Sequence, residues 1–157
     1  MTHPNLALDS NLMLLLAIGR AERGLVASHK RLRPYAEADY ELLQGFIAVS
    51  EAVITTPNVM TEVSNLADYG VLEPSRSRVS ASVKGLTAAF VEVYWQSRQL
   101  TDFLEFERLG LADCSLLAIL DRRTRLLTVD NALYIAALQR GSAALNFHHI
   151  RVARGLA

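Results

Sequence analysis

Short apolar runs alternate with longer amphipathic stretches along the chain, and this pattern predicts alternating strands and helices. Strands are expected at residues 6–8, 53–56, 125–129 and 143–147. Helices are expected at 10–19, from about 39 to 50, from Pro57 to a stop at Gly70, at 112–123 and at 131–140. Strands that alternate with helices need crossover connections, so the pattern predicts a mostly parallel sheet with helices on both faces.

Two stretches depart from this alternation. Residues 20–35 are polar and basic, which predicts an excursion over the surface that ends at Pro34. Residues 74–109 show apolar positions at steps of three and four, so only helices are expected there. No internal repeat, low-complexity tract or linker interrupts the pattern, and residues 1–157 are therefore interpreted as a single domain.

Composition sets limits on the class of protein. Of 157 residues 51% are hydrophobic and 20% charged, enough to bury a substantial core, and the formal net charge of zero gives no overall basic field. A single cysteine, Cys114, excludes an internal disulfide or a cysteine-based zinc site and is interpreted as a small core residue. The N-terminus is a poor signal peptide and the apolar stretch at 12–18 is too short to cross a bilayer, so we expect a cytoplasmic protein without membrane contact.

Four acidic residues follow or adjoin apolar runs at well-separated places in the chain: Asp9, Glu62, Asp113 and Asp130. Carboxylates at the carboxyl ends of parallel strands point into the crevice where open α/β sheets bind ligands. In such a crevice they repel one another unless a cation lies between them or some are protonated. Mg²⁺ and Mn²⁺ prefer hard oxygen ligands, so the pattern predicts a divalent-metal site and an enzyme that cuts phosphodiesters.

The segments around these acids resemble the PIN-domain ribonucleases, including bacterial toxins of the VapC type. The resemblance lies in residues 8–11, 56–63, 109–113 and 127–133, with acids in the order Asp, Glu, Asp, Asp. It implies a three-layer α/β/α sandwich with a mostly parallel central sheet. It also implies an endoribonuclease that hydrolyses RNA with Mg²⁺ or Mn²⁺. Many bacterial members of this size are toxins of toxin–antitoxin pairs, so a small antitoxin protein and a homodimer are implied as well.

Carried over to this chain, the resemblance gives each acid a role. Asp9, Glu62 and Asp113 would be the core metal ligands and catalytic residues, with Asp130 as a fourth acid that binds metal directly or through water. Asn11 and Thr128 match polar positions that often line the pocket. Ser10 and Cys114 stand where family members often carry Thr or Ala. Asp9→Asn is expected to abolish cleavage and leave the fold intact or firmer, because repulsion among the acids is relieved.

Other interpretations of these residues stay open. An Asp after a strand is commonly a helix cap, and Asp130 before a helix is the plainest case. Glu62 falls on an otherwise apolar side of its helix, where it would bind metal; alternatively it sits at the edge and faces water. The rival function is a non-catalytic PIN-like module that binds RNA or a protein through the basic stretch at 20–35.

Basic and aromatic residues add candidate contacts. The cluster of Lys30, Arg31 and Arg33 is either a guide for an RNA backbone or an ordinary solvated loop. His29 in the same stretch is a further candidate phosphate contact. The aromatic residues of 90–95 are expected to pack in a core or a dimer face rather than to stack on bases: Phe90, Tyr94 and Trp95.

Overall fold

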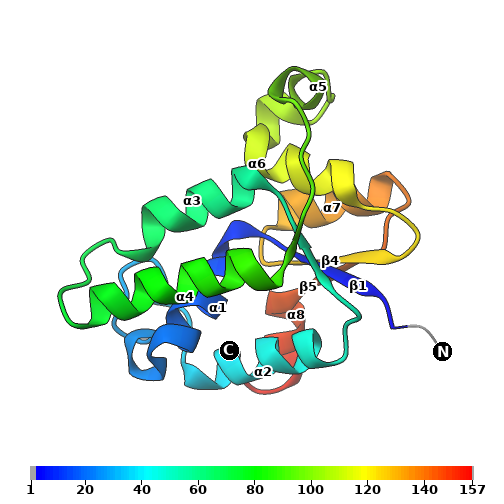
Figure 1. Ribbon diagram of the computed structural model, residues 1–157. Coiled ribbons are helices and arrows are strands. Elements are labelled where there is room, and N and C mark those ends of the chain that lie inside the picture. Colours follow the sequence, from blue (N-terminus) through cyan, green and yellow to red (C-terminus); the bar gives the residue numbers. More distant parts are fainter. Residues whose placement is uncertain (1–2, 157) are drawn as a thin grey trace.

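A computed structural model describes residues 3–156, and its centre is a five-stranded sheet in which all strands are parallel (Figure 1). The strands lie in the order β3-β2-β1-β4-β5. Their bounds are β1 (Asn5–Leu8), β2 (Val53–Thr55), β3 (Val91–Glu92), β4 (Thr124–Thr128) and β5 (Ala144–Asn146). The α/β fold with a parallel sheet, predicted from the alternating pattern, is confirmed.

The helices connect these strands and pack on one another. They are α1 (Ser10–Ala21), η1 (Arg23–Leu25), α2 (Glu37–Ala48), α3 (Pro57–Ala67), α4 (Ser75–Ala89), α5 (Ser97–Thr101), α6 (Phe106–Ile119), α7 (Asn131–Gln139) and α8 (Phe147–Ala153). Helix α1 packs against α2, α3 and α4, whereas α6 packs against α3, α5 and α7. In Figure 1, α5 and the start of α6 extend beyond the sheet at the top.

Helix α1 is the central helix, and residues 12–19 are all buried. The chain stays helical through Gly19, which was expected to stop it, as far as Ala21. A Cβ atom at Gly19 would lie 2.3 Å from Cδ2 of Tyr40, so this glycine allows α2 to approach α1 closely. Although α1 is strongly apolar, neither it nor any other helix within residues 3–156 is long and apolar enough to cross a membrane.

Several elements differ from the expected ones; α6, for example, runs over Phe106–Ile119, whereas a helix was expected at 112–123. Strand β3 lies in the stretch expected to hold only helices; it has two residues, both exposed at the sheet edge, within the mostly apolar residues 90–95, whose spacing had predicted a helix. The last strand ends at Asn146, and α8 follows where a longer strand and a basic tail were expected. Asn146 starts α8 because its side-chain oxygen accepts hydrogen bonds from the backbone N–H groups of His148 and His149.

The stretch at 20–35 is not a simple surface excursion. Val26, His29 and Leu32 are buried in it. The His29 ring bonds to the carbonyl of Ala67 (Nε2···O 3.0 Å) and accepts a hydrogen bond from the N–H of Arg31, so His29 is a core residue and not a phosphate contact. Three basic side chains of the stretch do remain exposed: Lys30, Arg31 and Arg33.

Candidate functional site

The strand order brings the ends of β1 and β4 together. The chain runs from β1 outward to β2 and β3, then returns to the other side of β1 with β4 and β5. The point where the order reverses, between β1 and β4, is where open parallel sheets bind ligands. Leu8 pairs with Leu127 in the register, so Asp9 and Asp130, which follow these strands, lie at the same edge.

Asp9 lies at the bottom of this edge and is 2% exposed. Its Oδ1 accepts from the N–H of Leu12 (2.8 Å), which caps α1, and its Oδ2 accepts from Thr128 Oγ1 (2.5 Å) and the N–H of Val129 (2.7 Å). Burial raises the pKa of Asp9, and the hydrogen bonds oppose that rise. Asp9 is therefore a helix cap and a tie between two strand ends, with one acceptor position left for a ligand.

Asp130 stands at the exposed rim of the same edge. Its Oδ1 accepts from the N–H of Leu133 (2.8 Å) and caps α7, as the alternative interpretation had it. Its own N–H donates to Thr128 Oγ1 (2.9 Å), so buried Thr128 bridges Asp9 and Asp130. Asn11, the other candidate for the pocket lining, is exposed in the first turn of α1.

Glu62 reaches the site from the second turn of α3. It is exposed, so the interpretation that places it at the edge, facing water, is correct and the buried-face argument is wrong. Ser10 Oγ donates to Glu62 Oε2 (2.9 Å), which joins the start of α1 to α3. Thr56 caps α3, and its hydroxyl lies 2.7 Å from that of Ser115 in α6.

Asp113 lies just after an interruption of α6. Gly110 has φ 80° and ψ −179°, so the helix restarts and Asp113 falls in its first new turn. The half-buried carboxylate accepts no hydrogen bond from the described residues. Burial raises the pKa of Asp113 to about 7, helped by the negative charges of, in order, Asp130, Asp9 and Glu62. The four acids thus lie within electrostatic range of one another.

The protein supplies no positive partner to this cluster. In the described part of the chain, every ion pair of Lys or Arg goes to another acid, and none goes to Asp9, Glu62, Asp113 or Asp130. Nor are any three His, Cys, Asp or Glu side chains of residues 3–156 already close enough together to hold a metal ion. The donors are nonetheless all hard oxygens, which suit Mg²⁺ because it keeps several waters and needs few direct carboxylates.

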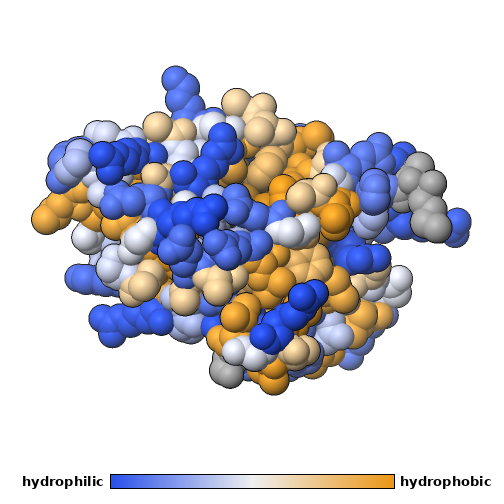
Figure 2. All heavy atoms as spheres, turned by 90° about the horizontal axis from the view of Figure 1, so that it is seen from below, coloured by the Kyte–Doolittle hydropathy of each residue, from blue (hydrophilic) through white to orange (hydrophobic). Residues whose placement is uncertain are grey.

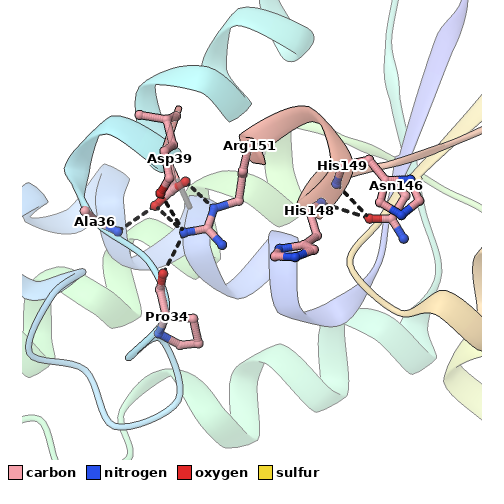
Figure 3. Close-up of polar contacts among 8 residues, drawn as sticks. Pro34, Ala36, Asp39, Asn146, His148, His149 and Arg151 are labelled. Carbon is pink, nitrogen blue, oxygen red and sulfur yellow. Dashed lines mark hydrogen bonds and ion pairs between the residues drawn. The ribbon is translucent and has the colours of Figure 1, made fainter. Parts of the chain in front are cut away.

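A buried ion pair joins α2 to α8 and has no signal in the sequence (Figure 3). Arg151 of α8 donates from Nε to Asp39 Oδ1 (2.5 Å) and from Nη2 to the carbonyl of Pro34 (2.7 Å). Asp39 also accepts from the N–H of Ala36 (2.8 Å), and the guanidinium lies 5.0 Å from the centre of the Tyr35 ring. These contacts fix α2, α8 and residues 34–36 to one another.

Tyr35 connects this ion pair to the acids. Burial raises the pKa of the Tyr35 phenol to about 12, and the charge of Asp9 is the next cause. Tyr35, at the end of the segment that carries the exposed Lys30, Arg31 and Arg33, therefore lies within electrostatic range of Asp9. Sequence reasoning missed Tyr35, because no spacing along the chain relates it to the acids. Ser10 and Ser115 lie next to or near Asp9 and Asp113 in the sequence, but their hydrogen bonds with Glu62 and Thr56 join residues more than 50 positions apart.

Comparison of this chain with protein-family models, with curated proteins and with solved structures found no match. Its function therefore has to be inferred from the site itself.

Proposed function

We propose that this protein is a divalent-metal-dependent endoribonuclease with a PIN-like, three-layer α/β/α fold. One observation carries the proposal: four carboxylates near the carboxyl edge of the sheet lie within electrostatic range of one another, and no cationic side chain of residues 3–156 is paired to them. Unpaired carboxylates that repel one another lower the stability of a folded protein. Their retention at the ligand-binding edge is explained if they serve to hold a cation.

Each of the four acids has a different role in the proposed site, set by its hydrogen bonds and burial. Asp9, held by three hydrogen-bond donors, gives a fixed oxygen at the bottom of the site. Asp113 and Glu62 give oxygens free to turn toward a cation, and Ser10 orients Glu62. Asp130 keeps its second oxygen at the rim. When bound, Mg²⁺ or Mn²⁺ supplies a water of lowered pKa and neutralises charge on the phosphate.

RNA is the proposed substrate because the chain carries an exposed basic cluster in the segment that leads to Tyr35. The exposed Lys30, Arg31 and Arg33 precede Tyr35, whose phenol lies within electrostatic range of Asp9. Positive side chains beside an acidic site hold phosphates and position the strand without reading its bases. With a net charge of zero, the chain attracts a polyanion through local basic clusters such as this one.

A toxin role with a small antitoxin partner, in a homodimer, belongs to the same proposal. An antitoxin would inactivate the site by placing an Arg among the free carboxylates. The surface offers an apolar area for association: seen from below, hydrophobic side chains gather among charged ones (Figure 2). A hollow on α2 also has apolar residues in its lining, Leu42, Phe46 and Val49, beside the charged Glu41 and Arg154, and Val49 is 58% exposed.

The alternative function is a non-catalytic module that binds RNA or protein. It is favoured by the fact that no three acids of residues 3–156 are already in position around one ion. The two functions differ in what a divalent ion does. A nuclease needs the ion for turnover, whereas a binding module holds RNA without cutting it.

The test is RNA cleavage with Mg²⁺ or Mn²⁺, compared with excess chelator. Asp113→Asn is expected to lower the cleavage rate at least about a hundredfold, since it removes a charged ligand. The matched control is Asp102→Asn, which changes an exposed Asp directly after α5 and should cleave like the wild type. Wild-type rates in Asp113→Asn would contradict the mechanism. RNA binding without turnover under any divalent ion would favour the alternative.

A further inference from the structure

A hollow of about 470 Å³ lies beside the acidic cluster, between α3 and the segment that joins β3 to α5. Glu62 belongs to both the hollow and the cluster, and Ala112 in its wall precedes Asp113. The hollow is therefore continuous with the proposed site of cleavage. Its volume is in the range of pockets that take small ligands, about 300–1,000 Å³.

Two aromatic rings face this hollow, and one is freely available. Tyr94 is 71% exposed, so the expectation that it packs in a core is wrong. The other expectation, a dimer face, stays a prediction. Trp95 is half-buried and packs partly against the hydrophobic core, as expected. An exposed aromatic ring beside a firmly held one forms a surface on which a planar group can stack.

The polar groups of the hollow suit an uncharged ring. Glu62 is the one charged side chain in its described lining, and its negative charge repels a phosphate. Asn58 and Asn65 of α3 add amides that can both donate to and accept from the edge of a heteroaromatic base.

We infer that this hollow binds an unpaired nucleobase of the RNA strand, stacked on Tyr94 and Trp95, next to the phosphate at the acidic cluster. The inference rests on the proposed function for the choice of RNA as ligand. It adds that the substrate is single-stranded at this position. In a duplex the bases are stacked on one another and their faces are closed to a protein ring.

Trp95 provides the measurement, because it is the only tryptophan in the chain. A uridine hexanucleotide titrated into the wild-type protein with excess chelator, so that no cleavage occurs, is expected to quench its fluorescence. A hexamer with the same sugar-phosphate chain but no bases, and a blunt RNA duplex, should not quench it. Equal quenching by the hexamer without bases would overturn the inference, because charge alone would then explain binding.

Three variants separate stacking from other effects. Tyr94→Ala is expected to weaken hexanucleotide binding about tenfold, the loss typical of one stacked base, whereas Tyr94→Phe keeps the ring and should bind like the wild type. Val152→Ala is the control: its side chain is also exposed (57%) but lies on α8, outside the lining of the hollow, and it should bind like the wild type. Tyr94→Ala binding with wild-type affinity would overturn the inference.

The outcome is distinguishable from that of the proposed function. Quenching that depends on bases and on Tyr94, with no cleavage under any divalent ion, would support this inference and contradict the proposed nuclease function. Metal-dependent cleavage that Tyr94→Ala leaves unchanged, with no quenching of Trp95, would do the reverse. If the hollow binds a protein segment instead, RNA will not change the fluorescence of Trp95, and this result would also overturn the inference.

Discussion

The carboxylate of Asp39 and that of Asp113, in the acidic cluster, have opposite surroundings in this molecule. Asp39 is 1% exposed and has a full set of partners, with two bonds from Arg151 and one from the N–H of Ala36. Asp113 is half-buried, accepts no hydrogen bond from the described residues, and lies within range of three more negative charges. The first arrangement stabilises the fold, and the second has no structural benefit to explain it.

This difference indicates which acids are free to bind a ligand. Asp9 is intermediate, because three donors hold it although it belongs to the acidic cluster. It lends rigidity to the site, whereas Asp113 and Glu62 supply unused oxygens. The predictions below test whether the paired and unpaired carboxylates differ in the way proposed.

Removing the partner of Asp39 should have the largest effect. Arg151→Ala leaves a buried carboxylate without a counter-charge, so we expect the free energy of unfolding to fall by about 3–5 kcal/mol. Urea denaturation measures it. The control is Arg123→Ala, which removes the exposed pair with Glu51 (2.8 Å) and should change stability by less than about 1 kcal/mol. Equal effects of the two changes would mean that the buried pair is not a structural centre.

Adding a cation should stabilise the acidic cluster. With Mn²⁺ at about one hundred times its Kd, the wild-type protein should gain about 2.7 kcal/mol of stability by ligand binding to the folded state. Asp113→Asn should gain much less, because it loses a charged oxygen. Thermal unfolding with and without the ion measures both. An equal gain in the two proteins would place the ion elsewhere.

Asp9→Asn should lower stability, contrary to the expectation from the sequence that the fold would be intact or firmer. The N–H groups of Leu12 and Val129 donate to different oxygens of Asp9, and an amide has an oxygen at only one of the two places, so one donor loses its acceptor. The loss should be about 1–3 kcal/mol. In the control, Asp130→Asn, the side chain has one backbone N–H to cap and an amide oxygen can do so, so little change is expected. Urea denaturation that finds Asp9→Asn no less stable than wild type would restore the earlier expectation.

The smallest predicted effect depends on pH. The folded state raises the pKa of Asp113 from 3.8 to about 7, so it binds more protons than the unfolded state between these values. This residue therefore lowers stability progressively as pH rises from about 4 to 7. Asp113→Asn should match the wild type near pH 4 and exceed it by about 1 kcal/mol above pH 7, since partial exposure reduces the effect. Denaturation at both pH values measures the difference, and a constant difference would contradict it.

The parallel sheet and most helices could be predicted from the sequence because each depends on local patterns. Apolar runs mark β1 and β4, and Pro57 begins α3 as its place in the sequence suggests. Strand β3 escaped prediction because its two residues are exposed and are held by pairing with β2, which is not a local property. For the same reason His29 was assigned to the surface, although it bonds to Ala67, 38 residues away.

The sequence by itself determined which residue types are present and where most elements begin, including the placement of Asp9 and Asp130 directly before helices that they cap. Tertiary structure alone decided which carboxylates are paired. Arg151 and Asp39 meet across 112 residues, whereas Asp113 meets only other negative charges. The physical reason is that the charge of a carboxylate is set by its neighbours in space, and strand order and helix packing choose those neighbours.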